Sequence, residues 1–257
     1  MKVRLLLSDY HFGYGSNLNW SDWKKWCNER NKDPNSLKAE PGTFVLPDYE
    51  LEFHYYSGGR RGGALDVVKL RGHAVAGMLF QVSDDGWDSL DAKEGHPNYY
   101  ERKKVQVLSE SGELRTAITY VVVPDRVKKE HVPPGPGYIE AVERGYEYHG
   151  ITKAHPWAKI QLLASAKGKV TKSSVNHLFI YGTLRAGEER SEILSEFSSK
   201  TYKDCKIRGS LIDLRGGYPG LISGDGSVVG EIHHTPKIQN ALKNLDTIEG
   251  FNGYGED

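Results

Sequence analysis

The chain has 257 residues, and its 34 lysines and arginines balance 34 aspartates and glutamates, so the formal net charge is zero. Without a positive field to attract polyanions, the composition argues against a nucleic-acid-binding protein. Two cysteines are too few for the disulfide framework of a small secreted domain, so the chain fits a reducing, cytoplasmic compartment.

The first elements expected in the chain are a strand, a turn and a helix. Residues 1–9 contain too short an apolar run for a signal peptide or a membrane span. The apolar residues before Tyr14 favour a strand, Gly15 permits a sharp turn, and Ser21-Asp22 is a candidate N-cap for a helix over Trp23 to Cys27. Backbone amides left free at such a junction bind a carboxylate, or the oxyanion that forms when a carbonyl is attacked.

Alternating and apolar runs predict most of the remaining elements. Residues 133–137 (PPGPG) cannot continue a helix or a strand and are expected as a surface loop, followed by a helix over 157–165. Strands outnumber helices. They are expected over residues 49–56, 74–82, 104–108 and 117–123 in the first half, and over 177–182, 206–214 and 227–233 in the second.

A carboxylate motif lies in the first half, at Leu90–Gly95 (LDAKEG). Leu90 can anchor this segment in the core and Gly95 ends it, which lets Glu94 face a cleft and exchange protons. Taken singly, a glutamate before a glycine is more often a solvated helix end, and a glycine turn is more often an ordinary connection.

Both motifs recur in the second half of the chain, in the same order. Tyr181–Leu184 (YGTL) repeats the turn of Tyr14–Leu18 (YGSNL), and Leu245–Gly250 (LDTIEG) repeats Leu90–Gly95. A turn and a distant carboxylate that occur twice indicate one site built twice by duplication. We therefore expect a first domain over residues 1–166, a polar linker over 167–176 and a second domain over 177–257.

These motifs resemble those of the gamma-glutamylcyclotransferase family. In the first half the resemblance covers most of residues 8–165, and in the second half it is closer to a shorter branch that includes gamma-glutamylamine cyclotransferases. The segments that carry it are 12–18, 77–80, 90–95, 99–105, 119–122 and 133–138 in the first half, and 178–184, 218–221, 229–231 and 245–250 in the second.

The resemblance implies an α+β fold of two mixed β-barrels with flanking helices. It also implies a reaction without metal or organic cofactor, in which the α-amino group of a gamma-glutamyl substrate attacks its own γ-carbonyl to give 5-oxoproline and a free amine. By the same resemblance, Glu94 and Glu249 are the catalytic candidates. The substrate-binding candidates are Tyr14, Gly15, Ser16, Asn17, Leu18 and Tyr120 in the first half, and Tyr181, Gly182, Thr183 and Leu184 in the second.

The second copy departs from the family pattern near its end. Glu249 to Tyr254 matches Glu94 to Tyr99 in spacing, but nothing after it corresponds to Lys103 to Val123. A barrel without those strands exposes an unpaired edge. We therefore expect an incomplete second barrel, and either a partner, the first domain or a second copy of the chain can complete its sheet.

Other motifs support no different chemistry. Ser57–Gly63 lacks the Gly-Lys-Ser/Thr ending of a phosphate loop and is expected as a loop bordering the first cleft. None of the ten histidines has the spacing of a catalytic zinc helix. Two functions remain open: a cyclotransferase, whose leaving group can be an amino acid, an amine or the remainder of glutathione, and a non-catalytic binding or scaffolding protein of the same fold.

Overall fold

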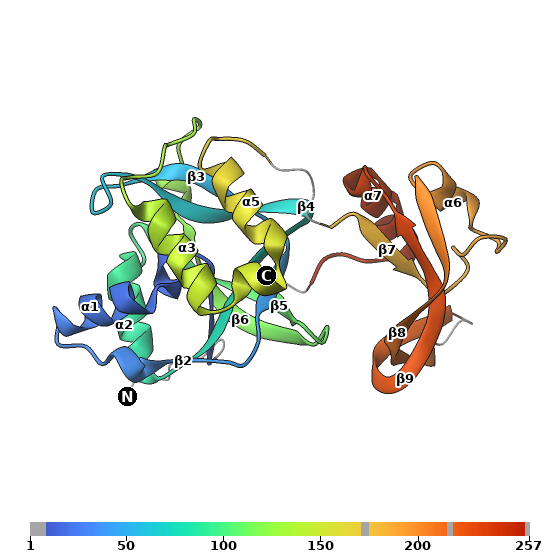
Figure 1. Cartoon of the computed structure of the whole chain (residues 1–257), viewed down its shortest axis with the longest axis horizontal. Coiled ribbons are helices and arrows are strands. Elements are labelled where there is room, and N and C mark those ends of the chain that lie inside the picture. Colours follow the sequence, from blue (N-terminus) through green and yellow to red (C-terminus); the bar gives the residue numbers. More distant parts are fainter. Residues whose placement is uncertain (1–8, 171–174, 215–217, 255–257) are drawn as a thin grey trace. The chain divides into compact units, whose positions relative to one another are not determined.

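A computed structural model describes residues 9–170, 175–214 and 218–254. The described residues form two compact units, one of residues 9–170 with 253–254 and the other of residues 175–214 with 218–252. Figure 1 shows the ribbon of each unit. Residues 1–8, which hold most of the N-terminal apolar run, lie outside the described residues.

The first unit is built on a closed β-barrel (Figure 1). Its strand order is β1-β6-β5-β3-β4, and β1 also pairs with β4, which closes the ring. The only parallel pairing recorded among the described strands joins β1 to β6, and a short strand β2 extends the sheet from β4. The strands are β1 (Tyr10–Gly13), β2 (Leu37–Ala39), β3 (Phe44–Ser57), β4 (Gly62–Val82), β5 (Tyr100–Ser109) and β6 (Leu114–Val122).

Helices flank this barrel. The first of them begins earlier than the sequence suggests, because Asn19 and not Ser21-Asp22 is its N-cap: the Asn19 side chain accepts a hydrogen bond from the Asp22 amide. The helices are α1 (Trp20–Asn28), α2 (Asp84–Glu94), α3 (Tyr138–Tyr148), α4 (Ile151–Ala154) and α5 (Pro156–Ser165), with 3-10 turns η1 (Ser16–Leu18), η2 (Pro34–Ser36) and η3 (Pro124–Arg126).

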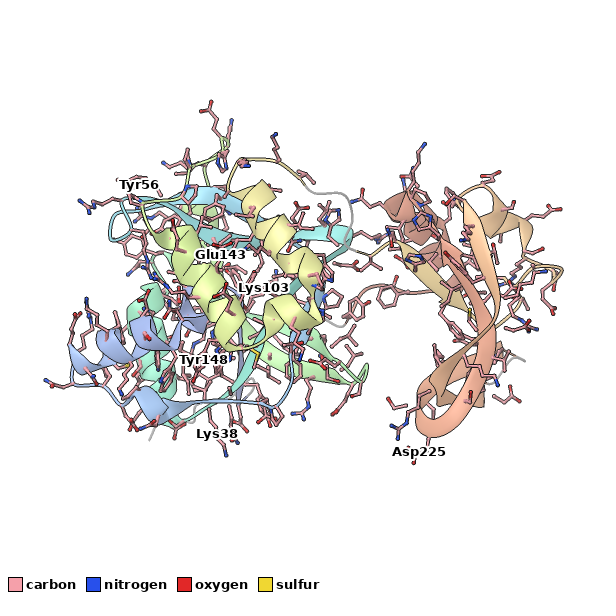
Figure 2. The ribbon with its side chains drawn as sticks, viewed as in Figure 1. Lys38, Tyr56, Lys103, Glu143, Tyr148 and Asp225 are labelled. Carbon is pink, nitrogen blue, oxygen red and sulfur yellow. The ribbon has the colours of Figure 1, made fainter. Side chains whose placement is uncertain are left out.

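One continuous hydrophobic core fills the first unit and fixes the helices to the barrel. Trp23 of α1, Trp87 of α2 and Tyr146 of α3 are almost fully buried in it. Gly145 of α3 permits a close approach to η1, because a Cβ atom there would lie 2.6 Å from Leu18 Cβ. Polar aromatic side chains that do not join the core, such as Tyr148, point outward (Figure 2).

The second unit repeats half of this barrel. Its sheet has the order β7-β9-β8, which matches β1-β4-β3 of the first unit. Gly230 packs against the carbonyl of Ile180 as Gly77 packs against that of Gly13, since a Cβ atom at either glycine would lie 2.3 Å from the oxygen. Its elements are β7 (His177–Ile180), β8 (Lys200–Leu214), β9 (Tyr218–His234), α6 (Glu192–Ser195) and α7 (Ile238–Glu249).

The expected fold class is confirmed: the chain is α+β, with one closed barrel and a second, incomplete one. Within the described part of the second unit no strands correspond to β5 and β6, and the buried cluster is small: Ile180, Leu184, Leu194, Ala241 and Leu245. Every strand that the sequence predicts overlaps an observed strand, and most of the observed strands are longer. No described helix has the length and apolar character needed to cross a membrane.

A buried histidine between two carboxylates ties the strands of the first unit together. His54 Nε2 lies 2.7 Å from Asp66 Oδ2, and its Nδ1 lies 2.7 Å from Glu52 Oε2. The other Asp66 oxygen accepts hydrogen bonds from the amides of Val67 and Val122, so β3, β4 and β6 meet at this carboxylate. Burial by itself lowers the pKa of His54, but the two carboxylates outweigh it and raise the pKa above its ordinary value.

The contacts of His54 with Asp66 and Glu52 are expected to stabilise the first unit most at acidic pH. A histidine whose pKa is higher in the folded chain contributes fully below about pH 6.5, and the contribution is lost as the pH rises through the folded-state value. His54→Gln should therefore lower the melting temperature of the first unit more at about pH 5.5 than at about pH 9, measured by calorimetry. The exposed His131→Gln is the control, and an equal loss for His54→Gln at both pH values would contradict the assignment.

Candidate active site

The glycine turn after β1 presents free backbone amides, as its sequence predicts. Leu18 donates its amide to the Gly15 carbonyl at 3.1 Å, and Asn19 donates to Ser16 at 3.1 Å. Within the described part of the chain no group accepts from the amides of Gly15, Ser16 and Asn17. Leu18 is fully buried and anchors the turn to the hydrophobic core, and its side chain does not line the pocket.

Glu94 is the last residue of α2 and faces this turn. Gly95 ends the helix in the left-handed conformation (φ 67°, ψ 35°), which a glycine adopts without strain. The side-chain amide of Asn17 donates to Glu94 Oε1 at 2.5 Å, so the turn and the carboxylate meet directly. Burial raises the pKa of Glu94, and the Asn17 hydrogen bond and the charges of Lys93 and Arg60 moderate the rise.

A second carboxylate, one helical turn earlier, holds α2 on the barrel. Asp91 accepts two hydrogen bonds from the Arg102 guanidinium, at 2.8 and 2.9 Å, and one from the Tyr120 hydroxyl at 2.6 Å. The guanidinium also lies 4.5 Å from the ring centroid of Trp87 in the same helix. The hydroxyl of Tyr120 is therefore engaged by Asp91, while its side chain still lines the pocket.

A pocket with a cavity volume of about 40 Å³ lies between the turn and the helix. Three tyrosine hydroxyls bind the backbone around it: Tyr14 donates to the Tyr120 carbonyl and Tyr100 to the Leu65 carbonyl, both at 2.8 Å, and Tyr138 accepts from the Leu65 amide. These hydrogen bonds fix the walls. The lining residues are His11, Phe12, Gly13, Tyr14, Gly15, Ser16, Asn17, Leu65, Glu94, Tyr100, Tyr120 and Tyr138.

His11 brings a neutral acceptor to the same pocket. Its Nδ1 lies 3.1 Å from the Ile118 carbonyl, which can only accept, so Nδ1 carries the proton and Nε2 carries a lone pair. Burial lowers the pKa of His11 to about 4. Nε2 is buried and has no hydrogen-bond partner among the described residues.

Outside this pocket a wider cleft is lined by aromatic and charged side chains. Lys25 and Arg30 pair with Glu29, and Arg60 pairs with Asp22 at 3.8 Å. Lys93 makes no ion pair within the described part of the chain. Its ammonium lies 5.3 Å from the ring centroid of Trp26. The Ser57–Arg60 segment borders this cleft, as expected from its position in the sequence.

The second copy repeats the backbone of this site but not its polar contact. Arg185 donates its amide to the Gly182 carbonyl at 3.1 Å, and Gly250 ends α7 in the left-handed conformation (φ 65°, ψ 25°). The side chain of Glu249, however, is exposed and makes no hydrogen bond or ion pair with any described residue. The remaining candidates lie at the turn: Leu184 is buried in the small core, Tyr181 stacks on Phe179, and Gly182 and Thr183 are half-buried.

Sequence reasoning found the turn and Glu94 but missed the residues that position them. Asp91 had a usable signal, because the aspartate recurs as Asp246 three residues before the second glutamate. The sequence contains no such signal for His11, Tyr100 and Tyr138, because isolated aromatic residues are ordinary in strands and helices. Within the described residues, no group of three or more histidine, cysteine or acidic side chains is placed to hold a metal ion.

Comparison with known proteins identifies relatives of both halves. The model of the family described as "Gamma-glutamyl cyclotransferase, AIG2-like" matches residues 11–139 and 178–257, one segment in each unit. A curated relative is the "Gamma-L-glutamyl-butirosin B gamma-glutamyl cyclotransferase" of Niallia circulans, which is 38% identical over 80 residues. That alignment covers 31% of this chain, and the chain spans 49% of the length of that relative.

The comparison with solved structures finds a likeness in fold over part of this chain. An uncharacterized human protein is 24% identical with a TM-score of 0.50, covering 62% of this chain and 88% of that one. A structure described as "Gamma-glutamyl cyclotransferase" is 24% identical with a TM-score of 0.49, covering 64% of this chain and 94% of that one.

The Asp91 contacts are expected to be needed for the stability of the first unit. Asp91→Ala leaves the Arg102 guanidinium and the Tyr120 hydroxyl without their acceptor and should lower its free energy of unfolding by about 2–3 kcal/mol. Denaturant titration measures this change. The control is Glu101→Ala, an exposed carboxylate beside Arg102, which should stay within about 0.5 kcal/mol. Equal effects of the two substitutions would contradict the role of Asp91.

Proposed function

Because the chain belongs to the gamma-glutamyl cyclotransferase, AIG2-like family, we propose that its first unit converts a gamma-glutamyl amino acid to 5-oxoproline and the free amino acid. The observation that supports this most is the half-buried Glu94 carboxylate, hydrogen-bonded to Asn17 beside the unpartnered amides of the turn. A general base and oxyanion donors on one pocket are what an intramolecular acyl transfer needs.

In the proposed reaction the substrate closes on itself. Glu94 takes a proton from the α-ammonium group, and the amine nitrogen attacks the γ-carbonyl carbon to form a five-membered ring. The carbonyl oxygen becomes an oxyanion, which the amides of Gly15, Ser16 and Asn17 stabilise. The bond from carbon to the leaving nitrogen then breaks as Glu94 returns the proton to that nitrogen. The ring nitrogen gives up its second proton to Glu94, and the freed amine takes that proton and leaves as an ammonium.

The chemistry suits a site of this simplicity. Both reacting groups belong to one molecule, so holding it in a curled conformer contributes roughly 7–11 kcal/mol through orientation. Each well-placed oxyanion donor adds about 3–4 kcal/mol. The walls that fix the conformer are the aromatic side chains whose hydroxyls bind backbone groups, Tyr14, Tyr100 and Tyr138. No covalent nucleophile is required.

The environment of Glu94 fits a group that both takes and returns a proton. Its recorded hydrogen-bond partner is the neutral amide of Asn17, and burial raises its pKa above the ordinary value. His11 adds a second acceptor, because its uncharged Nε2 faces no protein donor. We propose that this nitrogen accepts an N–H of the substrate amine and so directs the lone pair of the amine toward the γ-carbonyl.

The outer cleft favours a leaving group that carries a carboxylate. Lys93 is the one cation of this cleft for which the described residues provide no ion-pair partner. It directly precedes Glu94, so it borders the site at which the leaving nitrogen is protonated. The α-carboxylate of a leaving amino acid is one bond beyond the carbon attached to that nitrogen, whereas a polyamine or aminoglycoside would bring further positive charge.

For the repeated turn and Glu249 of the second unit, a binding role fits better than a second cyclotransferase site. Glu249 is exposed, so it lacks the desolvation and the amide partner that distinguish Glu94. In the described part of this unit β7 and β8 each pair with β9 alone. We propose that these edges accept a further strand or a second copy of the chain, and that Tyr181, Gly182, Thr183 and Leu184 contribute to binding rather than to catalysis.

Glu94→Gln is expected to lower kcat for 5-oxoproline release from gamma-glutamyl-alanine by at least about a hundredfold. It should also raise the melting temperature at neutral pH. A carboxyl group whose pKa is higher in the folded state binds more protons in that state than in the unfolded state. Its contribution to stability therefore falls as the pH rises from the unfolded-state pKa to the folded-state pKa. The control is Glu101→Gln, which changes an exposed carboxylate. A folded Glu94→Gln protein with wild-type activity would contradict the assignment.

Lys93→Met is expected to separate the two classes of leaving group. It should reduce kcat/KM for gamma-glutamyl-alanine by roughly 10- to 100-fold, as for loss of a charged hydrogen bond. The value for gamma-glutamyl-ethylamine, which lacks the carboxylate, should change much less. Any altered pKa of Glu94 affects both substrates equally, so the ratio of the two values is the readout. The control is Lys25→Met at the rim, and an unchanged ratio for Lys93→Met would refute the assignment.

A further inference from the structure

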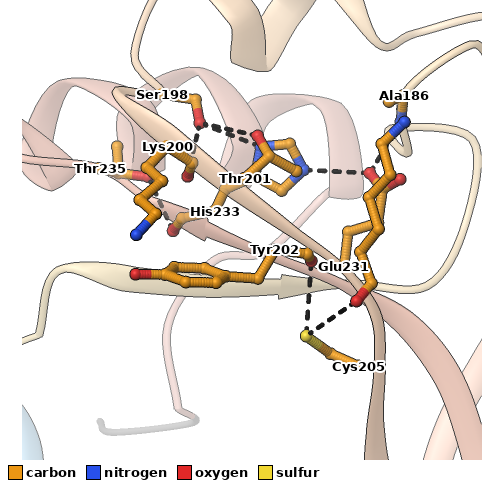
Figure 3. A network of polar contacts seen from close by, with 10 residues as sticks. Ala186, Ser198, Lys200, Thr201, Tyr202, Cys205, Glu231, His233 and Thr235 are labelled. Carbon is orange, nitrogen blue, oxygen red and sulfur yellow. Dashed lines mark hydrogen bonds and ion pairs between the residues drawn. The ribbon is translucent and has the colours of Figure 1, made fainter.

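The second unit contains a polar network that the cyclotransferase site does not use (Figure 3). Ser198 Oγ lies 3.2 Å from His233 Nδ1, and His233 Nε2 lies 3.3 Å from Glu231 Oε2. His233 and Glu231 are buried, with 6% and 8% of their surface exposed. From this arrangement we infer that Ser198 is a nucleophile activated by His233 and Glu231, and that it attacks small hydrophilic esters.

The hydrogen bonds fix the tautomer that this chemistry needs. Burial by itself raises the pKa of Glu231, but the hydrogen bond from the Ala186 amide at 2.8 Å and the contact with His233 outweigh it and hold the pKa below its usual range. Ionised Glu231 can only accept, so His233 Nε2 carries the proton. The lone pair is then on Nδ1, which faces the hydroxyls of Ser198 and Thr201.

The serine is accessible from solvent. It is half-buried and lines an open hollow of the second unit together with Ser191, Ser195, Lys200 and Thr201. Five of the ten residues that line this hollow carry a hydroxyl group, which suits a polar acyl group: Ser191, Ser195, Ser198, Ser199 and Thr201. The order of the three parts is nucleophile, base and orienting carboxylate, which is the arrangement of activated serines on unrelated folds.

The proposed step balances with water as the only co-reactant. His233 Nδ1 takes the Ser198 hydroxyl proton while Oγ attacks the ester carbonyl, and the same proton then leaves with the alcohol. Water hydrolyses the acyl-serine and restores the hydroxyl. Thr201 Oγ1 lies 3.4 Å from Ser198 Oγ and is the nearby donor for the oxyanion. Because one hydroxyl replaces a full oxyanion hole, turnover should be slower by about a hundred- to a thousandfold than with two donors.

The chain provides its own control in the adjacent pair. Ser199 Oγ lies 2.7 Å from His234 Nδ1, a shorter contact than that of Ser198, but this serine is exposed. Within the described residues no carboxylate holds the other nitrogen of His234. If a short contact to histidine alone activated a serine, Ser199 would react first. If the carboxylate is required, Ser198 reacts.

The test uses the full chain and a small fluorophosphonate probe, with the modified residue located by mass spectrometry. We expect one adduct, on Ser198, which is lost in Ser198→Ala and kept in Ser199→Ala. His233→Gln and Glu231→Gln should slow labelling by at least about a hundredfold. Since Glu231 also holds the Ala186 loop, calorimetry must show that the second unit of each variant remains folded.

The outcomes separate this inference from the cyclotransferase proposal. Glu94→Gln should keep the Ser198 adduct, and Ser198→Ala should keep 5-oxoproline release. p-Nitrophenyl acetate should give a burst of nitrophenol that Ser198→Ala lacks and that Thr201→Val slows. Absence of an adduct on Ser198 in the wild-type chain, equal labelling of Ser199, or labelling that does not depend on His233 would overturn the inference.

Discussion

The candidate site depends on one constraint, which is that a helix must end over a turn made by a different part of the barrel. Helix α2 is fixed near its C-terminal end by Asp91, which binds Arg102 of β5 and Tyr120 of β6. Glu94, one turn later, then reaches Asn17 in the turn after β1. The closing of the barrel by the β1–β6 and β1–β4 pairs brings these three regions together.

The two copies show which part of this arrangement is essential. In the second unit the turn, the helix and the left-handed glycine after the glutamate are all present. Its described residues include no counterpart of β5 and β6, which supply Arg102 and Tyr120 in the first unit. Without those strands the helix lacks that clamp, and Glu249 is exposed where Glu94 is desolvated. The repeated motif alone therefore does not make the site.

The sequence predicted the motifs that local chemistry determines and missed what long-range packing determines. The glycine turn, the glutamate before Gly95 and the duplicated order follow from spacing within short segments. The start of α1 was wrong because Asn19 competes as a cap with the serine two residues later. Partners such as Asp91 and Arg102, or His11 and Ile118, join distant segments whose register only the closed barrel fixes. No periodicity in a single sequence encodes that register.

Two carboxylates on one face of α2 receive different roles from their surroundings. Asp91 is paired with a guanidinium and a phenol, so its charge is fully compensated and it serves as a structural anchor. Glu94 meets a neutral amide in a partly buried pocket, so its charge is less compensated and its pKa is raised. Environments that separate two acids in this way are a general means of assigning one to structure and the other to proton transfer. The desolvation that raises the pKa of Glu94 also costs folding free energy, and the Asp91 clamp, together with the core around Trp87, offsets that cost.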